Sequence, residues 1–127
     1  MKHPKVNRPT FFNLTQLQLP VGALTSILHR VSGVLLALGV PVSLYLLELS
    51  LQSPQTYSQV GALFENRAVQ AAAILLAWAL GHHLLAGLRH MLSDIDIGSQ
   101  LPDARRSAWI VNVCGIGVAL LAAGALR

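Results

Sequence analysis

The sequence predicts an all-α integral membrane protein with three transmembrane helices. Hydrophobic residues make up 54% of the 127 residues and charged residues only 11%, which is about half the charged share of a typical globular protein. Three long apolar runs, at about 25–51, 68–92 and 108–126, are each long enough to span a hydrocarbon core of about 30 Å. A chain with so few charged side chains cannot cover an apolar fold with a polar shell, so a soluble fold is excluded.

The net charge of +4 does not indicate a nucleic-acid-binding protein. The basic residues are scattered, without the basic stripe and interleaved aromatic side chains of such proteins. They follow the positive-inside rule instead, because the N-terminal arm carries three and the loop at 93–107 carries the pair Arg105-Arg106. We expect this arm and this loop to face the cytoplasm at a bacterial-type inner membrane. Cys114 is the only cysteine, which excludes an internal disulfide.

The chain is expected to form a single domain over residues 1–127, in which an arm at 1–24 precedes a three-helix region at 25–127. Pro20 and Gly22 argue against a continuous helix within the arm. The first span follows, and Pro41 near its middle predicts a local kink.

The polarity of the sequence also predicts the two segments that connect the spans. The segment 52–67 is expected to be a polar linker, and 93–107 a second loop. The last span, at 108–126, is rich in glycine and alanine, which suits close packing between helices in lipid.

The second span contains two adjacent histidines, His82 and His83, and an ionisable residue inside a membrane span marks a functional site. Neighbouring residues on a helix point about 100° apart, so one metal ion cannot easily bind both. Gly87 and His90 share a helical face with His83. A haem iron accepts a histidine axial ligand, so His83 is the candidate ligand and His82 a candidate packing residue.

Two further features accompany this interpretation of His83. Ala79 and Ala86 flank it, and such small residues leave room for a large flat group such as a haem. Arg89 and His90 lie at the end of the span, where a cation can meet haem propionates or extend to the lipid headgroups.

A second polar cluster opens the first span. Ser26, His29 and Arg30 have the spacing i, i+3, i+4, which places them on one helical face. A hydroxyl, an imidazole and a guanidinium at the membrane boundary are able to hydrogen-bond a carbonyl ligand that enters from lipid. The alternative is that Thr25 or Ser26 caps the helix and Arg30 anchors it. The predicted topology brings this cluster to the same membrane face as Arg89, His90 and Asp94.

The histidines taken one by one are also compatible with two other functions. The histidines of a structural anchor without haem would only hydrogen-bond between helices. A proton-conducting subunit would use His82, His83 and Glu48, although polar steps between Glu48 and the histidines are scarce in the first span.

Three motifs together resemble a known family. They are Arg8-Pro9, the segment SILHRVSG from Ser26 to Gly33, and H-x3-G-x-R-H-x3-D from His83 to Asp94. Their order and spacing, over nearly the whole chain, resemble the cytochrome b membrane-anchor subunit of succinate dehydrogenase, respiratory complex II. The combination of SILHR with HxxxGxRH is far more specific than either motif alone.

The resemblance implies the chemistry of the site. The histidine that opens H-x3-G-x-R-H-x3-D, here His83, is an axial ligand of a b-type haem (haem b), and a sister anchor subunit provides the other ligand. Ser26 and Arg30 line a ubiquinone site. His29 lies near the haem propionates, and we expect Arg30 and His90 in the same vicinity. For Arg89, His90 and Asp94, both ordering of the propionates and a place in the docking surface stay open. No residue of this chain is implied to be catalytic by itself.

The resemblance also implies the partners. A second membrane-anchor subunit, an iron–sulfur subunit and a flavoprotein subunit complete a succinate:quinone oxidoreductase, with the last two docked on the cytoplasmic face. Lipid surrounds the spans, and no nucleic acid takes part. The alternatives are the anchor of a quinol:fumarate reductase and a structural membrane anchor without haem.

Overall fold

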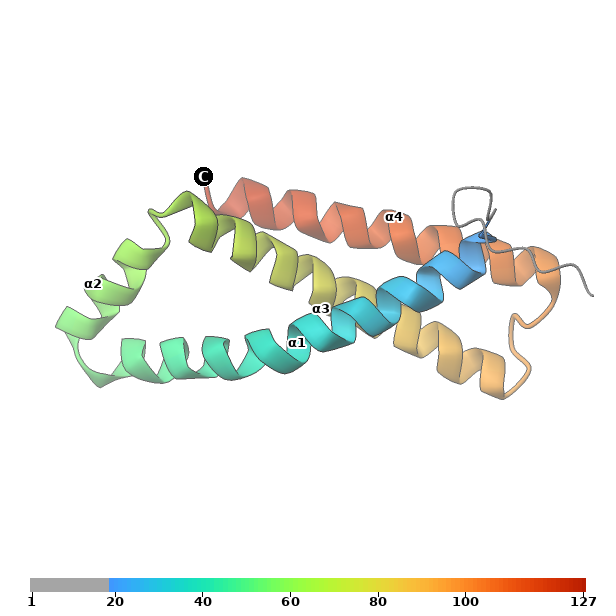
Figure 1. Ribbon diagram of the computed structural model, residues 1–127, viewed down its shortest axis with the longest axis horizontal. Helices are drawn as coiled ribbons and strands as arrows, with labels where there is room; N and C mark the ends of the chain where they lie inside the picture. Colours follow the sequence, from blue (N-terminus) through green and yellow to red (C-terminus); the bar gives the residue numbers. More distant parts are fainter. Residues whose placement is uncertain (1–18) are drawn as a thin grey trace, which may run out of the picture.

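The computed structural model describes residues 19–127, which form four helices and no strand (Figure 1). In chain order these are α1 (Val21–Gln52), α2 (Pro54–Leu63), α3 (Arg67–Asp94) and α4 (Leu101–Ala125). Helices α1, α3 and α4 are long and apolar enough to cross a membrane, which confirms the prediction of an all-α protein with three spans. The arm residues 1–18, Arg8-Pro9 among them, lie outside the described residues.

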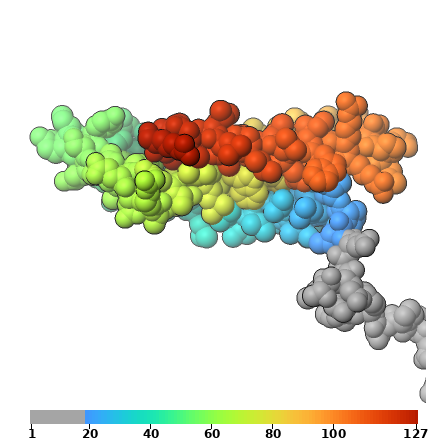
Figure 2. Space-filling view, turned by 90° about the horizontal axis from the view of Figure 1, so that it is seen from above, coloured from blue at the N-terminus to red at the C-terminus, as the bar shows by residue number. Residues whose placement is uncertain are grey.

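The three long helices form an elongated body with two different ends (Figures 1 and 2). Helix α3 packs against both α1 and α4, and α1 also contacts α4. The start of α1, the end of α3 and the start of α4 lie at one end, and α2 joins α1 to α3 at the other. We name the first of these the histidine end. The described arrangement therefore brings the start of the first span beside the end of the second, as predicted.

The interior of this body is small. Its buried apolar residues are Ala79, Ala86, Ala108 and Val111, and large apolar side chains lie on the outside, with Leu121 76% exposed. A soluble protein would bury such side chains, whereas lipid solvates them at no cost. The exposed apolar surface is therefore what a membrane-spanning bundle requires.

Helix α1 begins earlier than predicted. Its N-cap is Pro20, without a side-chain cap, so Gly22 lies in the first turn. The alternative in which Thr25 or Ser26 caps this helix is wrong, because Thr25 lies inside it and donates to Val21 O at 3.0 Å. The first N–H groups of a helix have no intrahelical partner, so a preceding proline is compatible with this start. Figure 1 shows α1, which contains Pro41, changing direction along its length.

The predicted linker at 52–67 contains a helix, α2. Ser53 and Thr56 form a capping box: Ser53 Oγ accepts from Thr56 N at 3.1 Å, and Ser53 N donates to Thr56 Oγ1 at 3.0 Å. Pro54 occupies the first turn, where its missing N–H costs nothing. The prediction of a linker without a helix was wrong because the polarity of 52–67 indicates only that this segment lies outside the lipid. It does not predict the segment's secondary structure.

Helix α4 begins at Leu101 rather than at 108, so the second loop is shorter than predicted. Pro102 and Asp103 lie in its first turn, where a proline and a carboxylate are both favourable. Arg89 of α3 joins this turn to the bundle, because its Nε donates to Ser107 Oγ at 3.0 Å and its Nη2 to Ala104 O at 3.2 Å. The predicted start at 108 was too late because the apolar run indicates only the part of α4 that lies in lipid, whereas the helix itself begins earlier.

Candidate functional site

Three imidazoles meet at the histidine end. The rings of His29 on α1 and His83 on α3 stack with centroids 4.1 Å apart and planes 20° apart. The ring of His90, also on α3, lies 5.2 Å from that of His29. The predicted common face of His83 and His90 is therefore confirmed. Both histidines face α1.

The ring of His83 is held by two acceptors on α1. Its Nδ1 lies 3.0 Å from the carbonyl oxygen of His29 and 3.1 Å from Oγ of Ser32, whose hydroxyl donates to the same carbonyl at 2.8 Å. A carbonyl oxygen only accepts, so Nδ1 carries the ring proton and Nε2 keeps its lone pair. This is how a metal-ligating histidine is usually oriented, with one nitrogen donating to a carbonyl and the other free for the metal.

Ser32 was missed in the sequence-based prediction. It is fully buried, and its contact with His83 crosses from one helix to another. The available signal was a polar residue inside an apolar run, three positions after His29.

Two glycines allow the helices to approach at these histidines. A Cβ at Gly33 would lie 3.0 Å from Cε1 of His83. A Cβ at Gly87 would lie 3.4 Å from Nε2 of His29. The Gly33 position in particular has no room for a side chain while the His83 ring stays where it is.

Ser26 and Arg30 lie on the first turns of α1, next to His29. Ser26 is half-buried and Arg30 is exposed, so both are accessible from outside the bundle. Arg89 is close to this region, since a Cβ at Gly22 would lie 3.7 Å from its Nη2. The structure therefore brings the polar start of α1 together with the polar end of α3.

His82 takes a different place from His83. It is fully buried, and its Nε2 lies 3.1 Å from Oδ1 of Asn112 on α4. The expectation that Ala79 and Ala86 leave room beside His83 was wrong. Both are fully buried, because they lie on the side of α3 that carries His82 and packs against other helices of this chain. Open space for a large group must therefore lie elsewhere around His83.

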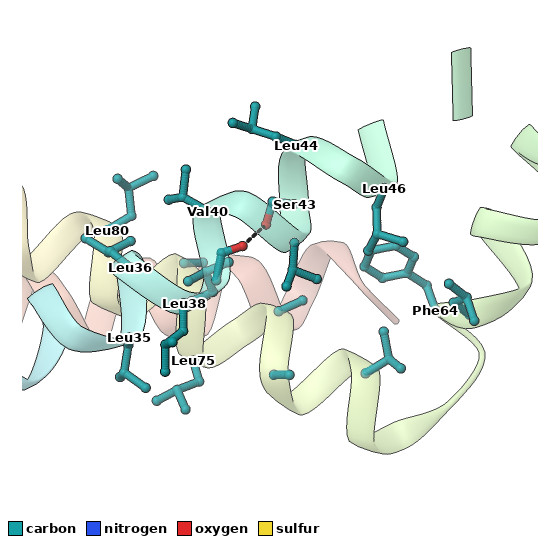
Figure 3. A pocket seen from close by; sticks show the side chains of 18 residues that line it. Leu35, Leu36, Leu38, Val40, Ser43, Leu44, Leu46, Phe64, Leu75 and Leu80 are labelled. Carbon is teal, nitrogen blue, oxygen red and sulfur yellow. Dashed lines mark hydrogen bonds between the residues drawn. The ribbon is translucent and has the colours of Figure 1, made fainter. Parts of the chain in front are cut away.

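A hollow of about 890 Å³ lies between α1, α2 and α3, away from the histidine end. Figure 3 shows side chains of α1 and α3 around it, with Phe64 at the end near α2. Its lining is apolar except for Ser43, whose hydroxyl donates within its own helix to Gly39 O at 2.9 Å. None of the predicted site residues lines it, so it offers no polar recognition and lies apart from the candidate site.

The described part of the chain does not form a complete metal site from its own side chains. Within residues 19–127, no three side chains of His, Cys, Asp or Glu are grouped closely enough to hold a metal ion. His83 alone is therefore suited to a metal whose other ligands come from a macrocycle or a second chain. Glu48 is exposed and lies roughly 28 Å along α1 from His29 by the helical rise, so it is not part of this cluster.

The chain is similar to known proteins along nearly its whole length. The model of the family described as succinate dehydrogenase/fumarate reductase transmembrane subunit matches residues 4–123. The succinate dehydrogenase cytochrome b556 subunit of Coxiella burnetii is 33% identical over 118 residues, which cover 92% of this chain and 94% of that relative. The cytochrome b556 subunit of Paracoccus denitrificans is 30% identical, with 91% of this chain and 88% of the relative covered.

A mitochondrial relative extends the similarity beyond bacteria. The succinate dehydrogenase cytochrome b560 subunit of Mus musculus is 29% identical over 128 residues, 98% of this chain and 73% of that relative. With three apolar spans and bacterial relatives along nearly its whole length, the chain is a multi-pass protein of the inner membrane. It belongs to the family of succinate dehydrogenase/fumarate reductase transmembrane subunits and is a non-catalytic membrane anchor of that enzyme complex.

Proposed function

We propose that this chain anchors a succinate:quinone oxidoreductase, shares a b-type haem with a sister anchor subunit and contributes to the site of quinone reduction. The observation that carries the proposal is the hydrogen bonding of the His83 ring. Its Nδ1 is bound to α1 through His29 O and Ser32, which leaves the Nε2 lone pair for iron.

His83 would be one axial ligand of the haem, and the sister subunit would supply the other. When bound, the haem supplies a one-electron redox centre beside the path to the quinone. His29, Arg30 and His90 are the groups of this chain placed to meet the propionates. A guanidinium and imidazole N–H groups make the charge-assisted hydrogen bonds that carboxylates require.

Ser26 and Arg30 would bind ubiquinone near the membrane surface. Electrons from succinate would reach this site through the flavoprotein and iron–sulfur subunits. The Ser26 hydroxyl would donate a hydrogen bond to a quinone carbonyl oxygen, and the Arg30 guanidinium would stabilise the negative charge that develops on that oxygen during reduction. The accessibility of both side chains supports this role.

The histidine end would face the cytoplasm. Arg30, Arg105 and Arg106 are exposed at this end, and an excess of basic residues marks the cytoplasmic side of membrane proteins. The iron–sulfur and flavoprotein subunits would dock there, so that electrons enter next to the quinone site.

The direct test is purification of the complex through a tag on this chain. We expect a flavoprotein, an iron–sulfur protein and a second anchor to co-purify, and a reduced-minus-oxidised spectrum with a b-type haem band. A complete complex without that band would leave a structural anchor without haem as the function. Assays of succinate oxidation and fumarate reduction on the same sample would distinguish the two directions of catalysis.

Replacing Gly33 with alanine is expected to weaken haem binding. The new Cβ would lie 3.0 Å from Cε1 of His83, so the ring has to shift by a few tenths of an ångström from the position in which its two acceptors hold it. Alanine favours the helix by up to about 1 kcal/mol over glycine, so any loss of haem comes from the contact and not from helix propensity. Haem content per purified complex measures the effect.

The matched control for this change is Gly117→Ala in α4. Among residues 19–127, a Cβ at Gly117 meets no side chain and no other helix within 4 Å, and the haem content of this variant is expected to equal that of the wild type. Full haem content in Gly33→Ala would contradict the close contact on which the prediction depends.

A further inference from the structure

A buried polar cluster joins all three long helices. It consists of Thr25 on α1, His82 on α3 and Asn112 on α4. Oδ1 of Asn112 accepts from Nε2 of His82 at 3.1 Å and lies 3.2 Å from Oγ1 of Thr25, whose single hydroxyl hydrogen is shared between this oxygen and Val21 O. Thr25 and His82 are both fully buried. Since the surrounding core is otherwise made of small and apolar residues, this cluster provides the directional contacts between the helices at this level.

The backbone of α4 lies close to His82. A Cβ at Gly115 would lie 3.3 Å from Cβ of His82 and 3.3 Å from Nε1 of Trp78, and the Trp78 and His82 rings are 5.3 Å apart. His82 Nδ1 is buried without a hydrogen-bond partner, so the ring depends on its single bond to Asn112. The absence of a side chain at Gly115 is what allows α4 to reach that ring.

A polar contact of this kind is needed to determine how α3 is rotated about its own axis. Much of α3 is apolar, and in a membrane apolar side chains are equally well solvated by lipid and by protein. Apolar packing alone therefore does little to distinguish one rotation from another, whereas a buried polar pair is known to specify helix register. His82 and His83 are adjacent and point about 100° apart. Directing His82 toward Asn112 thus directs His83 toward α1.

We propose that His82, held by Asn112 and Thr25, is a positioning residue for the axial ligand His83. The cluster sets the rotation of α3 at which Nδ1 of His83 meets His29 O at 3.0 Å and Ser32 Oγ at 3.1 Å. This rests on the proposed function, in which His83 Nε2 ligates the haem iron. His82 itself does not ligate, because its Nε2 is engaged by Asn112 inside the protein and the residue has no exposed surface.

The test compares His82→Leu with His82→Gln in the whole purified complex. The Gln amide offers a donor near the position of the imidazole Nε2, whereas leucine fills similar space without one. Supporting groups behind metal-ligating histidines contribute 10–100-fold to metal affinity, so we expect haem transfer to apomyoglobin on the order of tenfold faster from His82→Leu than from the wild type. His82→Gln is expected to keep the wild-type rate and the wild-type midpoint potential, and His82→Leu to shift the potential.

If the complex with His82→Leu does not assemble, two smaller substitutions at Thr25 test the same cluster. Thr25→Val removes the hydroxyl at constant shape, and Thr25→Ser keeps it; faster haem transfer is expected in the first only. Equal transfer rates and potentials in the wild type and the assembled Leu or Val variants would overturn the proposal. Equally fast haem transfer from His82→Leu and His82→Gln would also overturn it, because the imidazole itself, and not its hydrogen bond, would then be needed. Failure of the proposed function has a separate signature, namely a wild-type complex without haem or full haem in His83→Ala.

Discussion

Replacing His83 with alanine is expected to remove the b-type haem from the complex while its subunits remain together. The substitution deletes an imidazole whose Nδ1 is held by His29 O and Ser32 Oγ and whose Nε2 keeps its lone pair, in a residue that, unlike His82, is not fully buried. A haem held by one remaining axial ligand loses both affinity and its low-spin spectrum. The reduced-minus-oxidised spectrum and the haem content per complex measure the loss, which we expect to be nearly complete.

His90→Ala is the matched control for this experiment. His90 lies on the same face of α3 and also contacts the ring of His29, at 5.2 Å, but it is a propionate neighbour in the proposed arrangement. Its removal is expected to leave the haem band in place. Added imidazole is expected to restore part of the band in His83→Ala by occupying the vacated space. An unchanged band in His83→Ala would exclude His83 as the ligand.

Substitution of Ser26 or Arg30 by alanine is expected to slow quinone reduction without affecting succinate oxidation. A hydrogen bond to a charged group contributes about 1.5–3 kcal/mol, which corresponds to roughly a 10–100-fold lower rate when the bond forms in the reduction step. The oxidation of succinate takes place in other subunits. The rate with an artificial soluble acceptor is therefore expected to stay at the wild-type value, and the ratio of the two rates is the measurement.

The control is Ser43→Ala, which removes a hydroxyl from the same helix. Ser43 donates within α1 to Gly39 O and lines the hollow away from the histidine end, so both rates are expected to be unchanged. Arg30→Lys retains the charge but not the planar guanidinium, and an intermediate rate is expected. Equal loss of both activities in Ser26→Ala or Arg30→Ala would indicate failed assembly and contradict a role in quinone binding.

Part of the fold was predictable because it depends on local properties of the chain. The boundaries of the second span were predicted to within two residues, 68–92 against Arg67–Asp94. An apolar run must become a helix in lipid, where every backbone group needs an internal hydrogen bond. The common face of His83 and His90 was predictable for a similar reason, since helical geometry relates residues seven apart whatever surrounds them.

The ends of the other helices were less predictable. Hydropathy marks where the chain enters lipid, whereas a helix begins where its first N–H groups are compatible with a cap or a proline. The turns that begin at Pro54, after the cap at Ser53, and at Leu101 are therefore helical, although both lie in segments that are polar enough to have been assigned to a linker or a loop.

Three membrane-spanning helices could be predicted from hydropathy alone, and the motifs singled out His83, Ser26 and Arg30 as candidate site residues. The difference between the two adjacent histidines, in contrast, depends on how the helices pack. The tertiary structure places His82 against Asn112 and His83 against His29 and Ser32. Spacing along one helix gives the angle between two side chains, but the rotation of the whole helix depends on polar partners in other helices. Those partners, Ser32 and Asn112, are distant in the sequence and become recognisable only when the helices are packed together.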